Sequence, residues 1–75
     1  IFEKLRTLRQ TIAAEQGVPA YIVFCNGTLE EMAKLRPVHT WELMEVPGVG
    51  RKKADLYGER FMKLIRESYE EDELL

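Results

Sequence analysis

The apolar residues of this chain recur every three or four positions, which is the spacing of amphipathic helices. The pattern predicts a first helix over residues 2–16, whose apolar face carries Phe2, Leu5, Leu8 and Ile12. Gly17 suits the left-handed position that ends a helix, and Pro19 cannot continue it. No stretch shows the alternation typical of strands, so we expect an all-α fold.

Residues 18–24 are almost entirely apolar, but no second strand exists for them to pair with. We therefore expect a short, irregular helical turn in which Ile22, Val23 and Phe24 supply core. This leaves Tyr21, just after a rigid proline, facing outward. Two interpretations of Tyr21 stay open: a half-buried tyrosine with its hydroxyl in water, or an aromatic platform on which a base stacks.

Two further helices are predicted in the middle of the chain. Thr28 and the glutamate three residues later form a capping box for a helix that must end before Pro37. Thr40 is predicted to N-cap a very short helix. Trp41 on that helix is expected to be core or half-core, and His39 beside the cap is expected to be an ordinary surface residue.

The last helix is predicted to begin after Gly50, with one continuous face made by Ala54, Tyr57, Gly58, Phe61, Leu64, Ile65 and Ser68. A glycine in mid-helix costs about 1 kcal/mol relative to alanine, so Gly58 indicates close approach of another helix. The pattern fades after Tyr69. We predict a compact bundle of four main helices plus a short turn helix over residues 1–69, followed by an acidic, disordered tail over residues 70–75.

Size and composition argue against an enzyme. A chain of 75 residues with 45% apolar residues forms one small domain and leaves little room for an enclosed cofactor cavity. The single Cys25 excludes an internal disulfide and a zinc cluster, and it fits a reducing cytosol. No His/Cys/Ser constellation, metal set or phosphate loop followed by Lys-Ser/Thr is present. We expect no catalysis, no cofactor, no metal and no membrane partner, in a soluble fragment of a longer protein.

The net charge of −2 hides an uneven distribution. Residues 1–66 hold all eleven basic residues against eight acidic ones, a net charge of +3. The last nine residues add five acids and no base: Glu67, Glu70, Glu71, Asp72 and Glu73. A mildly basic body is thus followed by an acidic end, which we expect to compete for the cations of the body.

The stretch from Val46 to Gly50 reads Val-Pro-Gly-Val-Gly and is followed at once by Arg51, Lys52 and Lys53. Gly48 and Gly50 allow a tight turn and leave backbone N–H groups uncovered where the next helix starts. The start of a helix attracts anions, and three consecutive cations reinforce it, so a phosphate could dock here. The alternative is a plain helix–helix turn in which glycine serves only backbone conformation and packing.

Lys34 and Arg36 are two further candidate phosphate contacts. They lie in the last turn of the predicted middle helix, where cations suit the negative end of the helix dipole. That structural role is an adequate explanation of both residues on its own.

Four blocks of residues together resemble the HRDC domain, the helicase and RNase D C-terminal module. They are Phe2-x-x-Leu5-x-x-Leu8-Arg9, Val18-Pro19-Ala20-Tyr21-Ile22-Val23-Phe24, Thr28-Leu29-x-x-Met32-Ala33 and Pro47-Gly48-Val49-Gly50-x-x-Lys53-x-x-x-Tyr57-Gly58. The resemblance extends from Phe2 to about Ile65. The last block is also similar to the helix-hairpin-helix element of many DNA-binding proteins.

The resemblance implies a non-catalytic accessory domain of a bacterial, cytoplasmic and nucleoid-associated RecQ-type DNA helicase. Such a domain binds single-stranded or branched DNA weakly, as a monomer, and tunes the substrate choice of the parent enzyme. Tyr21 with nearby basic residues looks like the DNA-contacting spot. This chain departs from the family pattern at Ala20, where a second proline is common, and in its acidic end.

Two classes of function are therefore expected. In the first, Lys34, Arg36, Arg51, Lys52 and Lys53 neutralise phosphates while Tyr21 stacks on a base. In the second, the chain is an interaction module that contacts a basic partner or the helicase core of its own parent and has little affinity for DNA. The equivalent domain of a ribonuclease D is a further alternative.

Overall fold

The computed structural model of the protein describes residues 1–74, and their side chains through Asp72, so Leu75 lies outside the described residues. The described residues form five helices and no strand, which confirms the all-α prediction. The helices are α1 (Phe2–Gln16), α2 (Ala20–Val23), α3 (Asn26–Leu35), α4 (Thr40–Leu43) and α5 (Arg51–Leu74).

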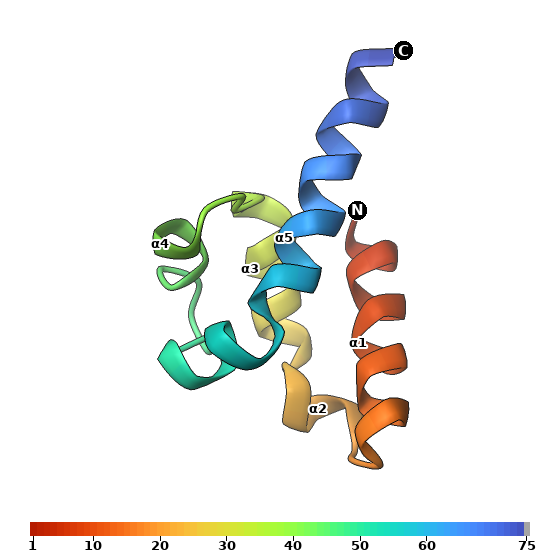
Figure 1. Ribbon diagram of the computed structural model, residues 1–75, viewed down its shortest axis with the longest axis vertical. Helices are drawn as coiled ribbons and strands as arrows, with labels where there is room; N and C mark the ends of the chain where they lie inside the picture. The colour runs from red at the N-terminus through yellow and green to blue at the C-terminus, as the bar shows by residue number, and fades with distance from the viewer. Residues whose placement is uncertain (75) are drawn as a thin grey trace.

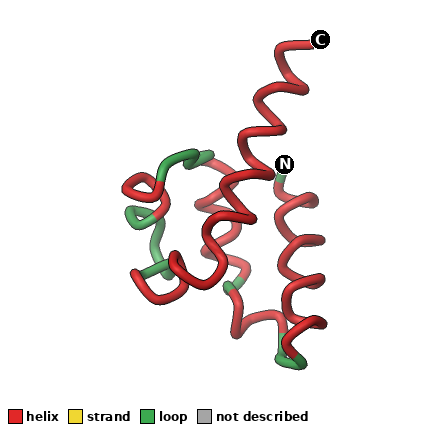
Figure 2. Tube along the Cα trace, in the orientation of Figure 1, coloured by secondary structure: helices red, strands yellow, loops and turns green. Residues whose placement is uncertain are grey.

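The helices form a small bundle around the long α5. Helix α1 contacts α2, α3 and α5, while α4 contacts α5 on the opposite side of the bundle. Figure 1 shows α2 at the lower end, where it links α1 to the start of α3, and α5 rising past the N-terminus. The loops in Figure 2 gather around α4 and at the base of the molecule, so the candidate glycine turn lies on the outside of the bundle.

One hydrophobic core joins all five helices. The largest fully buried side chains are Phe24, Phe61, Leu5, Ile12, Leu29, Met32, Leu43 and Ile65. Phe24 packs edge-on against two rings of α5, with centroids 5.1 Å from Phe61 and 6.0 Å from Tyr57. The residue between α2 and α3 therefore fixes the first half of α5.

The connection between α1 and α3 follows the prediction with one exception. Helix α1 ends at Gly17 in the left-handed conformation, and residues 20–23 form the expected helical turn. Val23 and Phe24 are fully buried, but Ile22 is 44% exposed. The expectation that Ile22 supplies core was wrong, because a single helical turn buries only one side, which here packs against α1.

The predicted caps of the two middle helices were also wrong. Helix α3 starts at Asn26 after Cys25, and Thr28 is buried inside its first turn. The Thr28 hydroxyl donates to the backbone oxygen of Pro47 at 2.9 Å, so a tertiary contact uses the group that was expected to cap. Helix α4 starts at Thr40, and the residue at its N-cap is His39.

Helix α4 packs closely on α5, as the mid-helix glycine indicated. A Cβ atom on Gly58 would lie 2.8 Å from Cδ2 of Leu43, which is fully buried. Trp41 is the exception on this helix, since it is 65% exposed. The prediction of a core or half-core indole was wrong, because Leu43 fills the space against α5 and Trp41 points the other way.

Helix α5 continues to Leu74, beyond the boundary at Tyr69 that the apolar pattern indicated. Two ion pairs hold this acidic end to other helices: Glu71 lies 2.5 Å from Nζ of Lys4, and Asp72 lies 3.0 Å from Nη2 of Arg36. The described part of the expected disordered tail is thus helical. Ion pairs formed in three dimensions do not appear in a hydrophobic pattern.

Within residues 1–74, no helix is both long enough and apolar enough to cross a membrane.

Candidate nucleic-acid interface

The glycine turn is a tightly constrained structure. Gly48 and Gly50 have φ angles of 89° and 49°, which disfavour residues with a Cβ atom. A Cβ atom on Gly48 would lie only 2.2 Å from Oγ1 of Thr28, so packing also requires glycine there. Val46 and Val49 are buried on the inner side of the turn. The turn is therefore held in one conformation by α3 and the core.

This turn delivers the chain directly into the start of α5. The first backbone hydrogen bond of the helix runs from the N–H of Ala54 to the oxygen of Gly50, at 3.0 Å. The N–H groups of residues 51–53 precede the helical hydrogen-bond ladder and carry the positive end of the helix dipole. Residues 48–53 surround an open hollow of about 450 Å³. The lining of this hollow is mostly apolar, so the attraction for an oxyanion such as a phosphate rests on the N–H groups at the helix start and on the exposed cations.

The three cations after the turn differ in their surroundings. Arg51 is exposed, and its Nε lies 3.4 Å from a carboxylate oxygen of Asp55, one helical turn on. Lys52 is exposed, whereas Lys53 is half-buried with its Nζ 5.9 Å from the centre of the Phe24 ring. Lys52 and Arg51 are thus the two cations of the triplet that solvent reaches most fully.

Tyr21 lies on α2 and is 65% exposed, so its ring faces outward as expected. Helix α2 ends at Val23, and the next residue, Phe24, contacts Lys53 and Tyr57 of α5. Tyr21 and the basic start of α5 therefore belong to the same, lower end of the molecule in Figure 1. The structure brings these two parts of the predicted site into one region.

Lys34 and Arg36 are not part of that region. Lys34 lies in the last turn of α3, and Arg36 is the C-cap of that helix. Both residues are therefore at the end of α3 that is opposite to the glycine turn (Figure 1). Nζ of Lys34 lies 3.3 Å from Glu31 on its own helix. The predicted site residues thus fall into two separate groups.

Arg36 has a structural role in holding α5. It ends α3 with a φ angle of 46°, and its Nη2 donates to Ser68 at 2.8 Å and to Asp72 at 3.0 Å. The guanidinium also lies over the ring of Tyr69, 4.0 Å from the ring centre. These contacts compete with any phosphate for Arg36.

Arg9 is a buried cation of α1. It is only 5% exposed, and its Nη1 donates to the backbone oxygen of Phe24 at 3.1 Å and to Oδ1 of Asn26 at 2.7 Å. These bonds fix the chain between α2 and α3. Its helical spacing from Leu5 and Ile12 was the signal that could have identified it as buried.

The titratable groups of the described residues offer little for catalysis. Hydrogen bonds from Thr28 lower the pKa of the exposed Cys25 thiol, and a hydrogen bond from Arg60 lowers the pKa of Glu15. Within the described residues, no group of three or more His, Cys, Asp and Glu side chains could hold a metal ion.

Comparison with known proteins identifies the same family that the sequence blocks resemble. The family model described as "HRDC domain" matches residues 1–65. The ATP-dependent DNA helicase RecQ of Bacillus subtilis is 47% identical over 66 residues, and that of Haemophilus influenzae is 43% identical over 67 residues. These matches cover 88% and 89% of this chain and 11% of each relative.

A solved structure agrees with the sequence matches. The fold superposes on HRDC domain 3 of D. radiodurans RecQ with a TM-score of 0.87 and 43% sequence identity, covering 91% of this chain and 90% of that one. The chain spans about a tenth of the length of the two RecQ relatives, so it corresponds to one module of such a protein.

Proposed function

Because this chain belongs to the HRDC domain family, we propose that it is a non-catalytic accessory domain of a RecQ-type DNA helicase in the bacterial cytoplasm. We propose that it acts as a monomer, associates with the nucleoid through its parent, and binds single-stranded or branched DNA weakly. By holding DNA beside the motor, it would tune which substrates the parent enzyme unwinds.

The observation that carries this proposal is the rigid glycine turn at the start of α5. Two residues with positive φ, Gly48 and Gly50, present the first N–H groups of a 24-residue helix beside the exposed side chains of Arg51 and Lys52. Free backbone N–H groups and two exposed cations therefore lie on adjacent residues at the start of α5. A DNA phosphate is the ligand that matches this arrangement and the family.

Tyr21 would complete the site as a stacking surface. Its exposed ring belongs to the same end of the molecule as the turn. Every base has a π face, whatever the sequence of the DNA. Phosphate contact at the turn and stacking on Tyr21 require no base-specific hydrogen bond. We therefore propose binding that is tolerant of DNA sequence.

The expected affinity is low. The body carries a net charge of only +3, and several of its cations are paired with carboxylates. Non-specific electrostatic binding gives a Kd of about 10⁻⁴ to 10⁻⁶ M at physiological salt. A value in that range would suit a domain that biases a helicase without anchoring it.

The test compares two single variants that each remove one exposed lysine of α5. Lys52→Ala lies at the turn, and Lys63→Ala lies about 16 Å further along the helix at 1.5 Å per residue. Fluorescence anisotropy with a labelled single-stranded oligonucleotide should show a weaker Kd and a shallower salt dependence for Lys52→Ala only. Equal losses in both variants would contradict a site at the turn.

A second candidate function has its own observation. The acidic residues at the end of α5 are arranged on an ordered helix, with Glu67 and Glu70 exposed to solvent. An ordered acidic helix is a suitable contact for a basic surface, such as one on the helicase core of the parent. A domain used in this way would give no oligonucleotide binding at any salt concentration in the experiment above.

A further inference from the structure

Trp41 is the single tryptophan of the chain, and it contributes little to the core. The side chain is 65% exposed, while the neighbouring Leu43 anchors α4 against α5. Met44, one helical turn after Trp41, is 39% exposed. A large aromatic side chain that packing does not require is available for another molecule.

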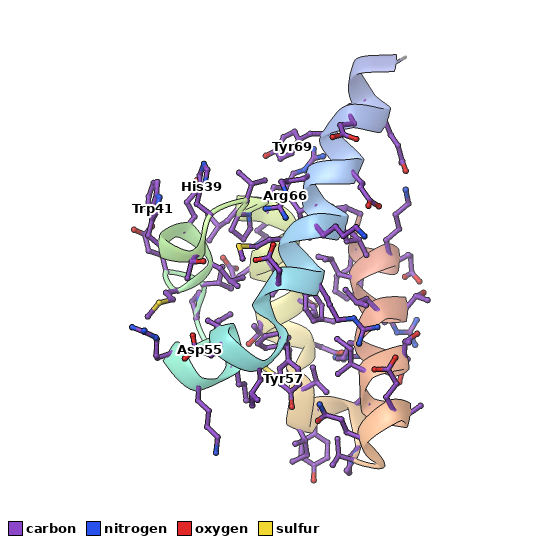
Figure 3. The ribbon with its side chains drawn as sticks, viewed as in Figure 1. His39, Trp41, Asp55, Tyr57, Arg66 and Tyr69 are labelled. Atoms are coloured by element: carbon purple, nitrogen blue, oxygen red, sulfur yellow. The ribbon has the colours of Figure 1, made fainter. Side chains whose placement is uncertain are left out.

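The indole is held in a defined orientation by a second ring. The rings of His39 and Trp41 are stacked with an interplanar angle of 6° and a centroid distance of 6.2 Å. Figure 3 shows the two side chains projecting in the same direction from the start of α4, away from α5. The pair therefore offers an outer flat face to solvent.

The backbone beneath this pair is also fixed. The carboxylate of Glu42 accepts hydrogen bonds from the N–H groups of Val38, at 3.2 Å, and His39, at 3.1 Å. The oxygen of Val38 accepts a hydrogen bond from Nη1 of Arg66, at 3.2 Å. A ligand that stacks on the pair would therefore restrict little additional backbone freedom, which favours binding.

The charged groups nearest the pair are the carboxylates of Glu42 and Glu59 and the guanidinium of Arg66, which together carry a net charge of −1. The carboxylate of Glu42 is occupied by backbone donors, and Arg66 is paired with Glu59 at 3.0 Å. The Arg66 side chain is 44% exposed and is bonded to the residue before His39, so one partly exposed cation lies beside the rings, and its contact with Glu59 competes with a phosphate. Flat aromatic surface with an adjacent guanidinium is the chemistry that recognises an unpaired nucleobase and its phosphate.

We propose that Trp41, backed by His39, is a second stacking site for one unpaired base of single-stranded DNA, with Arg66 beside the phosphate of that nucleotide. The inference rests on the proposed function, since it extends DNA binding to a face that is separate from Tyr21 and the glycine turn. Stacking supplies most of the binding at this site because Arg66, the cation beside the rings, is already paired with Glu59.

The first measurement uses the natural fluorescence of the protein. Because the chain has one tryptophan, its emission reports on Trp41 alone. Titration of the 75-residue chain with oligothymidylate should change that emission in a saturable manner. An unchanged emission at oligonucleotide concentrations that saturate anisotropy would overturn the proposal.

The second measurement compares variants by anisotropy with the same oligonucleotide. Trp41→Ala should weaken binding by about 5- to 150-fold, the range found for loss of one stacked base, and Trp41→Phe should restore part of it. Leu56→Ala is the matched control, because Leu56 is a large apolar residue of α5 that is 57% exposed. Its affinity should equal that of the unmodified chain.

Salt separates stacking from phosphate contact. The factor lost by Trp41→Ala should be the same at low and at physiological salt, because the indole is uncharged. The factor lost by Lys52→Ala should shrink as salt rises. A Trp41→Ala effect that vanished with rising salt would contradict stacking.

The outcomes distinguish this inference from the proposed function. If Lys52→Ala weakens binding and Trp41→Ala does not, the inference fails, the site at the turn stands, and the exposed indole belongs to a protein contact. If Trp41→Ala weakens binding and Lys52→Ala does not, the second site stands and the turn is not the DNA site. If the unmodified chain binds no oligonucleotide, both fail together.

Discussion

Thr28 and Gly48 hold the glycine turn against α3. The Thr28 hydroxyl donates to the oxygen of Pro47, and the space beside it admits no Cβ atom on Gly48. The Thr28 hydroxyl also forms a hydrogen bond with the Cys25 thiol, at 3.3 Å. One buried hydroxyl thus joins the start of α3 to the turn before α5. The conformation of the glycine turn thus depends on α3, although the turn itself precedes α5.

Gly48→Ala should destabilise the protein more than Gly50→Ala does. Both substitutions place a Cβ atom at positive φ, which costs about 1–3 kcal/mol, but only Gly48→Ala also collides with Thr28. Overpacking adds about 1–3 kcal/mol. Chemical denaturation of the two variants measures the difference, and equal losses of unfolding free energy would contradict the contact.

Much of the fold could be predicted because it depends on local patterns. The spacing of Leu5 and Ile12 predicts α1, and the run from Ala54 to Ser68 predicts the part of α5 that faces the core. Gly58 even indicated the close approach that Leu43 makes. Each of these signals lies within a few turns of one helix.

The errors concern residues whose role is decided by distant partners. Thr28 bonds Pro47, and Arg36 bonds Ser68 and Asp72, which lie 32 and 36 residues further along the chain. The candidate site shows the same limit. The sequence grouped Arg36 with Arg51, Lys52 and Lys53, although Arg36 ends α3 and the triplet begins α5, beyond the opposite end of α3. A residue type alone does not reveal which partner a fold will place beside it.

Arg9→Met should destabilise the protein by about 1–3 kcal/mol, because it removes the donor for the buried oxygen of Phe24. Arg6→Met is the matched control on the same helix, since the Arg6 side chain is 52% exposed and its pairing with Glu3 is a surface contact. The control should stay within about 0.5 kcal/mol of the unmodified chain. Urea titrations decide, and a neutral Arg9→Met would show that Arg9 does not hold this connection.

Tyr21→Ala should weaken binding of a single-stranded oligonucleotide by about 1–3 kcal/mol if the ring stacks on a base. The fold should change little, because the side chain is largely exposed. Circular dichroism and thermal melts check the fold, and anisotropy checks the affinity. A folded variant with unchanged affinity would leave Tyr21 as an ordinary surface tyrosine.

Glu15→Gln tests the pH dependence of one ion pair. Both oxygens of Glu15 accept hydrogen bonds from Arg60, at 2.7 and 3.2 Å, which lowers the pKa of Glu15 from its ordinary value of 4.5. A lowered folded-state pKa stabilises the protein above the unfolded value, and this stabilisation is lost as pH falls through the folded value. Glu15→Gln should therefore melt slightly below the unmodified chain at pH 7 and equal to it in acid. A Tm difference that did not change with pH would contradict this linkage.

The acidic end of α5 provides the last test, because its distance from the glycine turn sets its effect on DNA binding. Since α5 is continuous from Arg51 to Leu74, Glu71 lies about 27 Å along the helix from Lys53 at 1.5 Å per residue. The described end of α5 does not fold back over the turn, and the cations of the body with which its acids pair are Lys4 and Arg36. Charges at that separation are screened at physiological salt, where the Debye length is about 8 Å, but not at 0.01 M, where it is about 30 Å.

The double variant Glu71→Gln, Asp72→Asn removes both charges while keeping the size of the side chains. It should bind an oligonucleotide as the unmodified chain does at physiological salt and more tightly at about 0.01 M salt, because the acids act on the turn only through the unscreened field. Its stability should fall little, since the two pairs with Lys4 and Arg36 are surface contacts worth about 0–1 kcal/mol each. A several-fold tightening at physiological salt would mean that the acids do mask DNA-binding cations, and Arg36 is the cation that they contact.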